Sequence, residues 1–332
     1  MRGLRKKAVV LAAVAALAMS SLTGCSGDYA VDNNKVAVTV GDSEVSLGVV
    51  NFYLRHEQAS IEAAYAQALG ESFWKTEISD GYSFEENQKE SVINAFTQMY
   101  ILEDHMADYN VTLTEDELAK IEKAAADFVA NNAEETNKLV SGDVEIVKEV
   151  LKMCKISVKM FDAIVADVST EVSDEEAAQK RLAYLGFTKT DNITLEEAKK
   201  EAELFLEEAK EKGGILELAK EQQAPAHEYT FDSKTTEISK EIVAAADKLK
   251  EGEFAEIVES NGIYYVVQLI SEFDKEATEA KKTEIVNTRQ NEAFQKVYEP
   301  WQKATTIVID DKALADISLH GLKVAPKKAE KK

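Results

Sequence analysis

The spacing of apolar residues divides the chain into a mainly helical part and a mixed part. Val36–Val40 and Glu44–Leu47 alternate apolar and polar residues around a Gly-Asp-Ser turn, which predicts a short β-hairpin. Apolar residues then recur at spacings of three and four, which is typical of helices with one apolar face. Two such stripes are Val92, Ala95, Met99, Leu102 and Met106, and Val147, Val150, Cys154, Val158, Phe161 and Val165. The first part is therefore predicted to be a helical domain opened by a hairpin.

The pattern changes at Arg181, after which strand and helix signals are mixed. Residues 182–187 and 262–269 are rich in aromatic and β-branched residues, which predicts two strands. Three helices are expected between these strands, at residues 194–212, 215–221 and 242–249, and residues 222–234 are expected to be irregular. Capping residues predict helix starts at Thr114, Ser173 and Thr194. This order of elements describes a compact α+β unit.

A long charged helix is expected at residues 275–304, and a strand at 306–309. The predicted fold class is therefore α+β, with a mostly helical domain made of the N-terminal part and the C-terminal helix and strand, and with an α+β domain inserted between them. Residues 321–332 are rich in lysine, which predicts a basic disordered tail.

The first residues carry the features of a secretory signal. Four basic residues precede an apolar run from Ala8 to Met19, which is shorter than the ~20 apolar residues of a membrane span. Leu22-Thr23-Gly24-Cys25 then follows. This motif resembles a bacterial lipobox, in which the cysteine is lipidated and becomes the mature N-terminus. We therefore expect residues 1–24 to be a lipoprotein signal peptide, Cys25 to anchor the protein to a membrane, and residues 25–35 to be a tether outside the cytoplasm.

Charge and cysteine content exclude several classes of function. The net charge is −22, and loss of the four basic residues within 1–24 takes it to −26, which argues against a nucleic-acid partner. Only two cysteines are present, so a disulfide scaffold and a cysteine-based zinc site are excluded. With Cys25 lipidated, Cys154 is the one remaining thiol. Its place in an apolar stripe indicates a core residue rather than a reactive nucleophile.

Several segments carry a resemblance to a known family. They are Val36–Asp42, Val172–Glu176, Leu216–Glu221, Ala245–Glu253, and Val258 followed by Tyr264-Tyr265-Val266-Val267. In this order, behind a lipobox, they resemble the parvulin-type foldase lipoproteins and periplasmic chaperones, the PrsA/SurA-like group of peptidyl-prolyl isomerases. The resemblance implies a helical chaperone domain at residues 36–180 and 275–320, with a parvulin-like domain inserted at 181–274. It also implies that the strand at 306–309 pairs near Val36–Val40.

The resemblance also implies site residues. The two histidines of parvulins fall on Tyr184 and on Tyr265, or on Tyr264 if the alignment slips by one residue. The apolar cup for the proline ring falls on Ile238 and Ile242. Rotation about an X-Pro bond needs neither a cofactor nor a metal.

Two interpretations of the tyrosines are open: hydrogen-bond donors of an isomerase site, or aromatic residues of a non-catalytic domain. His227 lies beside Glu228 in a loop, which favours a solvated surface residue over a substitute catalytic group.

The implied partners are unfolded secreted proteins and, through Cys25, a membrane. Whether two copies form a homodimer is left open. Phe73, Trp74, Tyr82 and Phe84 form an aromatic stretch that suits either client contacts or core packing. The main function expected is a membrane-anchored foldase. The alternatives are a non-enzymatic chaperone or scaffold on the same fold, and a solute-binding lipoprotein, which would need two lobes of repeated strand–helix units.

Overall fold

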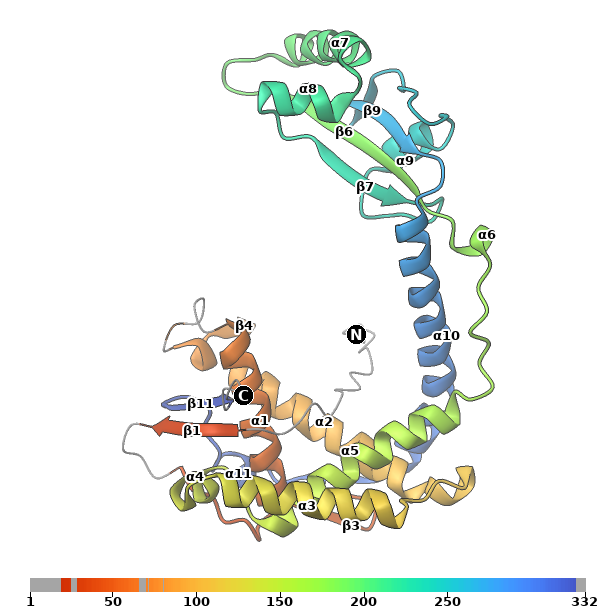
Figure 1. Cartoon of the computed structure of the whole chain (residues 1–332). Coiled ribbons are helices and arrows are strands. Elements are labelled where there is room, and N and C mark those ends of the chain that lie inside the picture. The colour runs from red at the N-terminus through yellow and green to blue at the C-terminus, as the bar shows by residue number, and fades with distance from the viewer. Residues whose placement is uncertain (1–18, 25–28, 66–69, 71, 80, 327–332) are drawn as a thin grey trace. The chain divides into compact units, whose positions relative to one another are not determined.

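The computed structural model describes residues 19–24, 29–65, 70, 72–79 and 81–326 (Figure 1). The chain forms two compact units. Unit 1 comprises residues 1–168 and 291–332, and unit 2 comprises residues 169–290. The chain therefore leaves unit 1, builds unit 2 from one continuous segment, and returns to unit 1. The expected α+β class, with one unit inserted into another, is confirmed.

Unit 1 is mainly helical. Its helices are α1 (Leu47–Tyr65), α2 (Phe84–Asp104), α3 (Glu115–Asn131), α4 (Glu134–Leu139), α5 (Val144–Ile164), α11 (Asp311–Leu314) and the later part of α10 (Lys275–Ala304), with 3-10 turns η1 (Phe73–Lys75) and η2 (Met106–Tyr109). The predicted capping box at Thr114 is confirmed. The Glu117 amide donates a hydrogen bond to the Thr114 hydroxyl at 3.2 Å, and the Glu117 carboxylate accepts one from the Thr114 amide.

The core of unit 1 lies between the apolar faces of α1, α2 and α5. Phe52, Phe96 and Met153, one from each helix, are at most 1% exposed. Phe52 also meets Phe128 of α3 edge to face, with ring centroids 5.1 Å apart. Cys154 is packed against the same core, and its burial raises the pKa of the thiol to about 12. The thiol therefore stays protonated at neutral pH, as a core cysteine does.

A three-stranded antiparallel sheet completes the core of unit 1. It contains β2 (Val36–Val40), β3 (Ser43–Ser46) and β10 (Ile307–Ile309), in the order β10-β2-β3. Ile307 lies opposite Val40 and Ile309 opposite Val38, which confirms the pairing expected between the two ends of the chain.

Two small antiparallel pairs, β4–β5 and β1–β11, complete the strands of unit 1. Their bounds are β4 (Glu77–Ser79), β5 (Tyr82–Ser83), β1 (Met19–Gly24) and β11 (Leu322–Pro326). Strand β11 lies inside the segment 321–332 for which a disordered tail was expected. The prediction of disorder rested on the many lysines and is wrong for residues 322–326, which form this strand. Leu322 is 1% exposed and packs into the core. Cys25 and residues 1–18 lie outside the described residues, so the signal peptide and the lipid anchor stay predictions.

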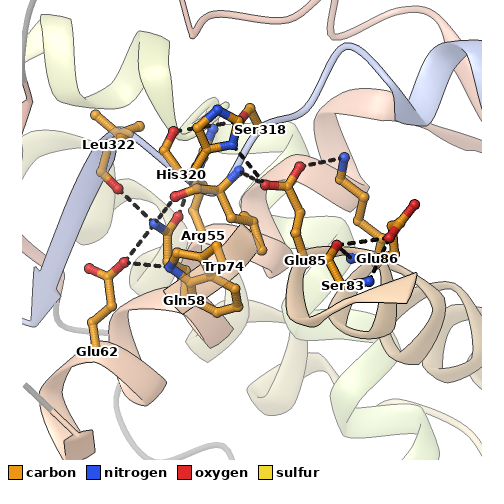
Figure 2. Close-up of polar contacts among 12 residues, drawn as sticks. Arg55, Gln58, Glu62, Trp74, Ser83, Glu85, Glu86, Ser318, His320 and Leu322 are labelled. Carbon is orange, nitrogen blue, oxygen red and sulfur yellow. Dashed lines mark hydrogen bonds and ion pairs between the residues drawn. The ribbon is translucent and has the colours of Figure 1, made fainter. Parts of the chain in front are cut away.

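A polar cluster fastens the C-terminal segment to α1 and α2 (Figure 2). The buried Gln58 amide donates hydrogen bonds to the carbonyl oxygens of Leu319 and Leu322, at 2.8 and 2.7 Å. The Glu85 carboxylate accepts a hydrogen bond from the Leu319 amide at 3.0 Å and contacts Nδ1 of His320 at 3.2 Å. These bonds, together with the burial of Leu322, explain why this segment is ordered.

Unit 2 is built around a four-stranded sheet. Its strands are β6 (Lys180–Thr188), β7 (His227–Phe231), β8 (Val258–Ser260) and β9 (Ile263–Ser271), in the order β7-β6-β9-β8. Its helices are α6 (Asp174–Ala177), α7 (Leu195–Lys212), α8 (Ile215–Gln222), α9 (Lys240–Ala246) and the first part of α10. Strand β7 falls where the sequence predicted irregular structure, and that prediction is wrong for residues 227–231.

Every strand pair among the described residues is antiparallel. The repeated strand–helix units that a solute-binding lipoprotein would need are therefore not found in this part of the chain. Within the same residues, no helix is both long enough and apolar enough to span a membrane.

Unit 2 extends beyond the predicted boundaries of 181–274 at both ends. Ion pairs join the two added segments. Lys282 of α10 lies 2.5 Å from Asp174, and Arg289 lies 2.6 Å from Glu176. These pairs join the segment before β6 to the first part of α10, so both belong to unit 2.

Candidate functional site

Alternate side chains of the unit 2 sheet point to two different faces. One face is covered by α7 and α8 and includes Ala183, Leu185 and Val266 (Figure 1). The other face includes Leu182, Val267 and the predicted site residues, and it packs against α9. The two faces have separate apolar clusters, so each can be assigned its own role.

Tyr184 of β6 and Tyr265 of β9 lie on the α9 side of the sheet, as the pairing of the strands requires. Their ring centroids are 6.0 Å apart, with an interplanar angle of 64°. His227 of β7 lies opposite Tyr184 in the register, with ring centroids 5.5 Å apart. Tyr229 lies two residues further along β7, in the same apolar cluster. We call these four residues, contributed by three adjacent strands, the tyrosine face.

A glycine positions Tyr265 on this face. Gly186 lies opposite Tyr265 in the register between β6 and β9. A Cβ atom at Gly186 would lie 2.9 Å from Cε1 of Tyr265, closer than such contacts occur. The ring of Tyr265 therefore lies over the backbone of β6 because no side chain is present there.

The environment keeps two of the phenols protonated. Partial burial raises the pKa of Tyr265, and the neighbouring Tyr184 raises it further. The pKa of Tyr229 is also raised, first by burial and then by Glu237 and Tyr184. A protonated phenol donates one hydrogen bond through its O–H group. The tyrosine face therefore offers hydroxyl donors at neutral pH.

The two isoleucines proposed for the proline cup differ in exposure. Ile242 on α9 is 2% exposed and belongs to the core beneath the tyrosine face. Ile238, just before α9, is partly buried and packs against the same cluster. Ile238 is therefore the one of this pair with apolar surface at the site. Tyr264, the alternative position for the second parvulin histidine, lies in the cluster on the α7–α8 face. It is therefore on the opposite side of the sheet from Tyr184 and Tyr265.

A hydrogen-bond network holds the start of α9 against β8. The Ser260 hydroxyl donates to the Glu241 carboxylate at 3.0 Å, and the Ser239 hydroxyl lies 3.0 Å from the Ser260 hydroxyl. The bond from Ser239 lowers the pKa of Glu241, with Ser260 contributing, so the carboxylate remains charged. This network positions Ile238 next to the tyrosine face.

Sequence reasoning missed part of the site. His227 and Tyr229 join the face because residues 227–231 form a strand rather than a loop. His227 is exposed, as expected, but its ring also contacts Tyr184. The available signal was the alternation of His227, Tyr229 and Phe231, which places all three on one side of a strand.

The aromatic stretch in unit 1 is used mainly for internal packing. Phe73 and Phe84 stack with ring centroids 4.5 Å apart. Trp74 is 5% exposed, and its Nε1 donates a hydrogen bond to Glu62 at 3.0 Å. The Tyr82 hydroxyl donates to Glu90. Of the two interpretations left open for these residues, the contacts favour core packing.

A separate pocket of about 460 Å³ lies in unit 1 between α2, α3 and α5. Its apolar lining includes Leu118, Ile121 and Met153, and Leu118 is 46% exposed. Four glutamates and two lysines also line it: Glu103, Glu122, Glu145, Glu149, Lys148 and Lys152. The pocket therefore combines apolar surface with an excess of negative charge. Among the described residues, no group of three or more His, Cys, Asp and Glu side chains is arranged to hold a metal ion.

The antiparallel sheet and the helices on its two faces agree with the inserted α+β domain that the sequence predicts. Residues 179–282 match the sequence model of the PPIC-type PPIASE domain, so this segment is similar to that domain family. The matched segment includes the whole tyrosine face. No curated protein matches the chain.

Several solved structures are similar to this chain. The foldase protein PrsA from Lactococcus lactis has 16% sequence identity and a TM-score of 0.33, over 85% of this chain and 97% of that one. PrsA from Streptococcus pneumoniae has 20% identity and a TM-score of 0.30, over 72% and 97%. A structure from work on PEB4 and Cj1289, two SurA-like chaperones of Campylobacter jejuni, has 11% identity and a TM-score of 0.30, over 84% and 100%. The similarity of unit 2 to the PPIC-type domain rests on the match to the sequence model and not on these structural similarities.

Proposed function

We propose that this protein is an extracytoplasmic, lipid-anchored foldase. Unit 1 holds unfolded secreted polypeptides, and unit 2 accelerates rotation about their X-Pro bonds at the tyrosine face. The observation that carries the proposal is a PPIC-type domain in which hydroxyl donors from three adjacent strands lie together on one face of the sheet. The lipid anchor rests on the Leu22-Thr23-Gly24-Cys25 motif.

The chemistry needs only hydrogen-bond donors and an apolar surface. The rotational barrier of a peptide bond is about 18–20 kcal/mol, because the carbonyl and the nitrogen are conjugated. In the twisted transition state this conjugation is lost, and the nitrogen becomes a hydrogen-bond acceptor. The Tyr184 and Tyr265 hydroxyls donate to the twisted amide, and Ile238 contacts the proline ring. Donors that bind the twisted amide more strongly than the planar one lower the barrier.

Isomerisation of short X-Pro peptides tests this proposal. We expect Tyr184→Phe and Tyr265→Phe each to lower kcat/KM by about tenfold, which corresponds to about 1.4 kcal/mol of transition-state stabilisation. Tyr264→Phe is the matched control, because it makes the same change on the same strand but on the opposite face. A similar loss in all three variants would show that the hydroxyls of the tyrosine face play no special role.

A non-catalytic domain that binds clients is the second candidate function. It is favoured by the burial of Ile242, which leaves Ile238 as the one predicted cup residue with accessible surface. Under this alternative the protein suppresses aggregation of an unfolded client but does not accelerate X-Pro isomerisation. Measuring both activities on one preparation separates the two candidates.

The anchor is tested at Cys25. We expect the protein to incorporate labelled palmitate and to remain in the membrane fraction, and Cys25→Ala to abolish both. Cys154→Ala is the control, since that thiol packs against the core of unit 1. Equal lipid incorporation in the Cys25→Ala variant would contradict the proposed anchor.

A further inference from the structure

Strand β10 of unit 1 presents an apolar edge of a sheet. Ile307, Val308 and Ile309 are 37%, 59% and 45% exposed, and β10 is the terminal strand in the order β10-β2-β3. In the part of the chain that the structure describes, no strand pairs with its outer side. Soluble proteins usually protect such an edge, because its unpaired backbone groups and apolar side chains can accept a strand from another chain.

The hydrogen bonds at the two ends of β10 show how the strand is oriented. The Gly41 amide donates to the carbonyl oxygen of Thr306 at 2.9 Å. The Asp310 amide donates to the carbonyl oxygen of Ala37, also at 2.9 Å. Thr306 and Asp310 therefore direct backbone groups toward β2, and the paired stretch extends one residue beyond β10 at each end.

This orientation determines which backbone groups face outward. In an antiparallel pair, alternate residues direct both N–H and C=O toward the same neighbour. Val308 lies opposite Thr39 and shares the orientation of Thr306 and Asp310. The N–H and C=O groups of Ile307 and Ile309 consequently point away from β2. The outer edge therefore offers two donors and two acceptors at the spacing of a strand.

We propose that this edge is the place where unit 1 takes up an unfolded client, as one extended segment added to the sheet beside β10. The proposal rests on the holding function proposed above and gives it a site and a ligand class. The ligand is an extended peptide with apolar residues at alternate positions. Backbone pairing supplies affinity that does not depend on sequence, and the exposed side chains of β10 select apolar partners.

The charges around the edge favour a basic client over a second copy of this chain. Asp310 and Asp311 follow the strand directly, and Asp42 lies in the hairpin turn beside Gly41. Asp104 is close to the same turn, with its Oδ2 atom 3.7 Å from the position of a Cβ atom at Gly41. Lys312 is the nearest basic residue in the sequence, and Lys35, next to β2, interacts with Asp310 but forms its ion pair with Asp316 at 2.8 Å. A second copy would add the same acidic groups, whereas lysine or arginine flanking an apolar segment would complement them.

The test uses a fluorescein-labelled peptide with the sequence Lys-Lys-Val-Thr-Val-Thr-Val-Thr. Its partner has the same sequence with the valine and threonine amides N-methylated, so that neither edge of the peptide can donate strand hydrogen bonds. We expect binding of the first peptide to full-length protein to exceed binding of the second by about tenfold or more. We also expect it to slow exchange of the Ile307 and Ile309 amide hydrogens by about tenfold or more.

Two variants at one position separate backbone pairing from apolar contact. Ile309→Pro removes an outward N–H group without removing a donor to β2, and proline is tolerated at such edge positions. Ile309→Thr keeps the N–H group and reduces the apolar surface. We expect the proline variant to lose peptide binding while the threonine variant weakens it severalfold. Leu204→Ser, which changes an exposed leucine of unit 2, should leave binding unchanged.

The outcomes distinguish failure of the site from failure of the function. Equal binding of the two peptides would overturn the proposed site, and so would equal suppression of client aggregation by the wild-type protein and the Ile309→Pro variant. Protection of the Ile307 and Ile309 amides that rises with protein concentration, without peptide, would assign the edge to a second copy. If the wild-type protein does not suppress aggregation at all, the holding function itself is wrong. If Ile309→Pro does not fold, the N-methylated peptide still decides the question.

Discussion

The two faces of the unit 2 sheet differ in how completely they are covered. The α7–α8 face is closed, because its alanines (Ala183, Ala202, Ala209 and Ala219) and the large Phe205 are all at most 5% exposed. Small side chains between larger ones let helices approach a sheet closely, and the packed cluster excludes water. The α9 face has tyrosines with partly exposed rings, and the short α9 covers part of it. One face therefore provides packing, whereas the other provides accessible hydrogen-bond donors.

The largest effect is expected from opening the packed face. Phe205 is 5% exposed and contacts Phe187 across α7 and β6, with ring centroids 5.5 Å apart. We expect Phe205→Ala to destabilise unit 2 by about 3–5 kcal/mol, because it leaves a cavity in a closed cluster. Denaturant unfolding measures this change. Tyr265→Phe, on the other face, should cost less than about 1 kcal/mol. Equal costs would remove the distinction between the faces.

A smaller effect is expected at Gly186 of β6, which lies against the ring of Tyr265 of β9. Gly186→Ala adds a Cβ atom 2.9 Å from Cε1 of Tyr265, so the ring must move. We expect kcat/KM for X-Pro peptides to fall severalfold while Tyr265 itself is retained. Thr188→Ala, on the same strand, is the control. If Gly186→Ala keeps full activity, the position of the Tyr265 ring does not matter for turnover.

The pH dependence should be flat in the physiological range. Burial raises the pKa of Tyr265 above its ordinary value near 10, so the donor stays protonated well above neutral pH. We therefore expect constant kcat/KM between about pH 6 and 9, with loss only above about pH 10, when the phenol ionises. A pH–rate profile on the folded protein measures this. A decline in activity below about pH 7 would contradict a mechanism that relies on tyrosine donors alone.

The smallest effect is expected on the outward surface of α7. Leu204 is 66% exposed, whereas Phe205 beside it is buried. We expect Leu204→Ser to change the free energy of unfolding by less than about 0.5 kcal/mol and to leave activity unchanged. A larger loss, measured by the same unfolding experiment, would show that this surface is covered in solution.

Local signals in the sequence predicted many elements of both units. The capping boxes at Thr114 and Thr194 correctly predicted helix starts. They could be recognised in the sequence because the hydrogen-bonded threonine and glutamate of each box lie within four residues. The pairing of β10 with β2 followed from the family resemblance, and the register confirms it. Cys154 was correctly interpreted as a core residue from its apolar stripe.

Features that depend on distant contacts were less predictable. Strand β7 follows Pro225 and contains exposed polar residues, and it is a strand because it pairs with β6. The burial of Ile242 depends on α9 packing against the sheet, which no local pattern shows. The choice between Tyr264 and Tyr265 needed the strand register, because adjacent residues point to opposite faces.

The way the chain closes unit 1 has a consequence for the order in which the protein folds. Gln58 and Leu322, joined by a hydrogen bond, are 264 residues apart in the sequence, whereas unit 2 is one continuous segment. Contacts between distant residues form later, because a long loop must close first. During synthesis, unit 2 can fold before β10 has been made. Strand β2 can pair with β10 only after nearly the whole chain has been synthesised. Unit 1 is therefore still incomplete at a stage of synthesis when unit 2 is already able to fold.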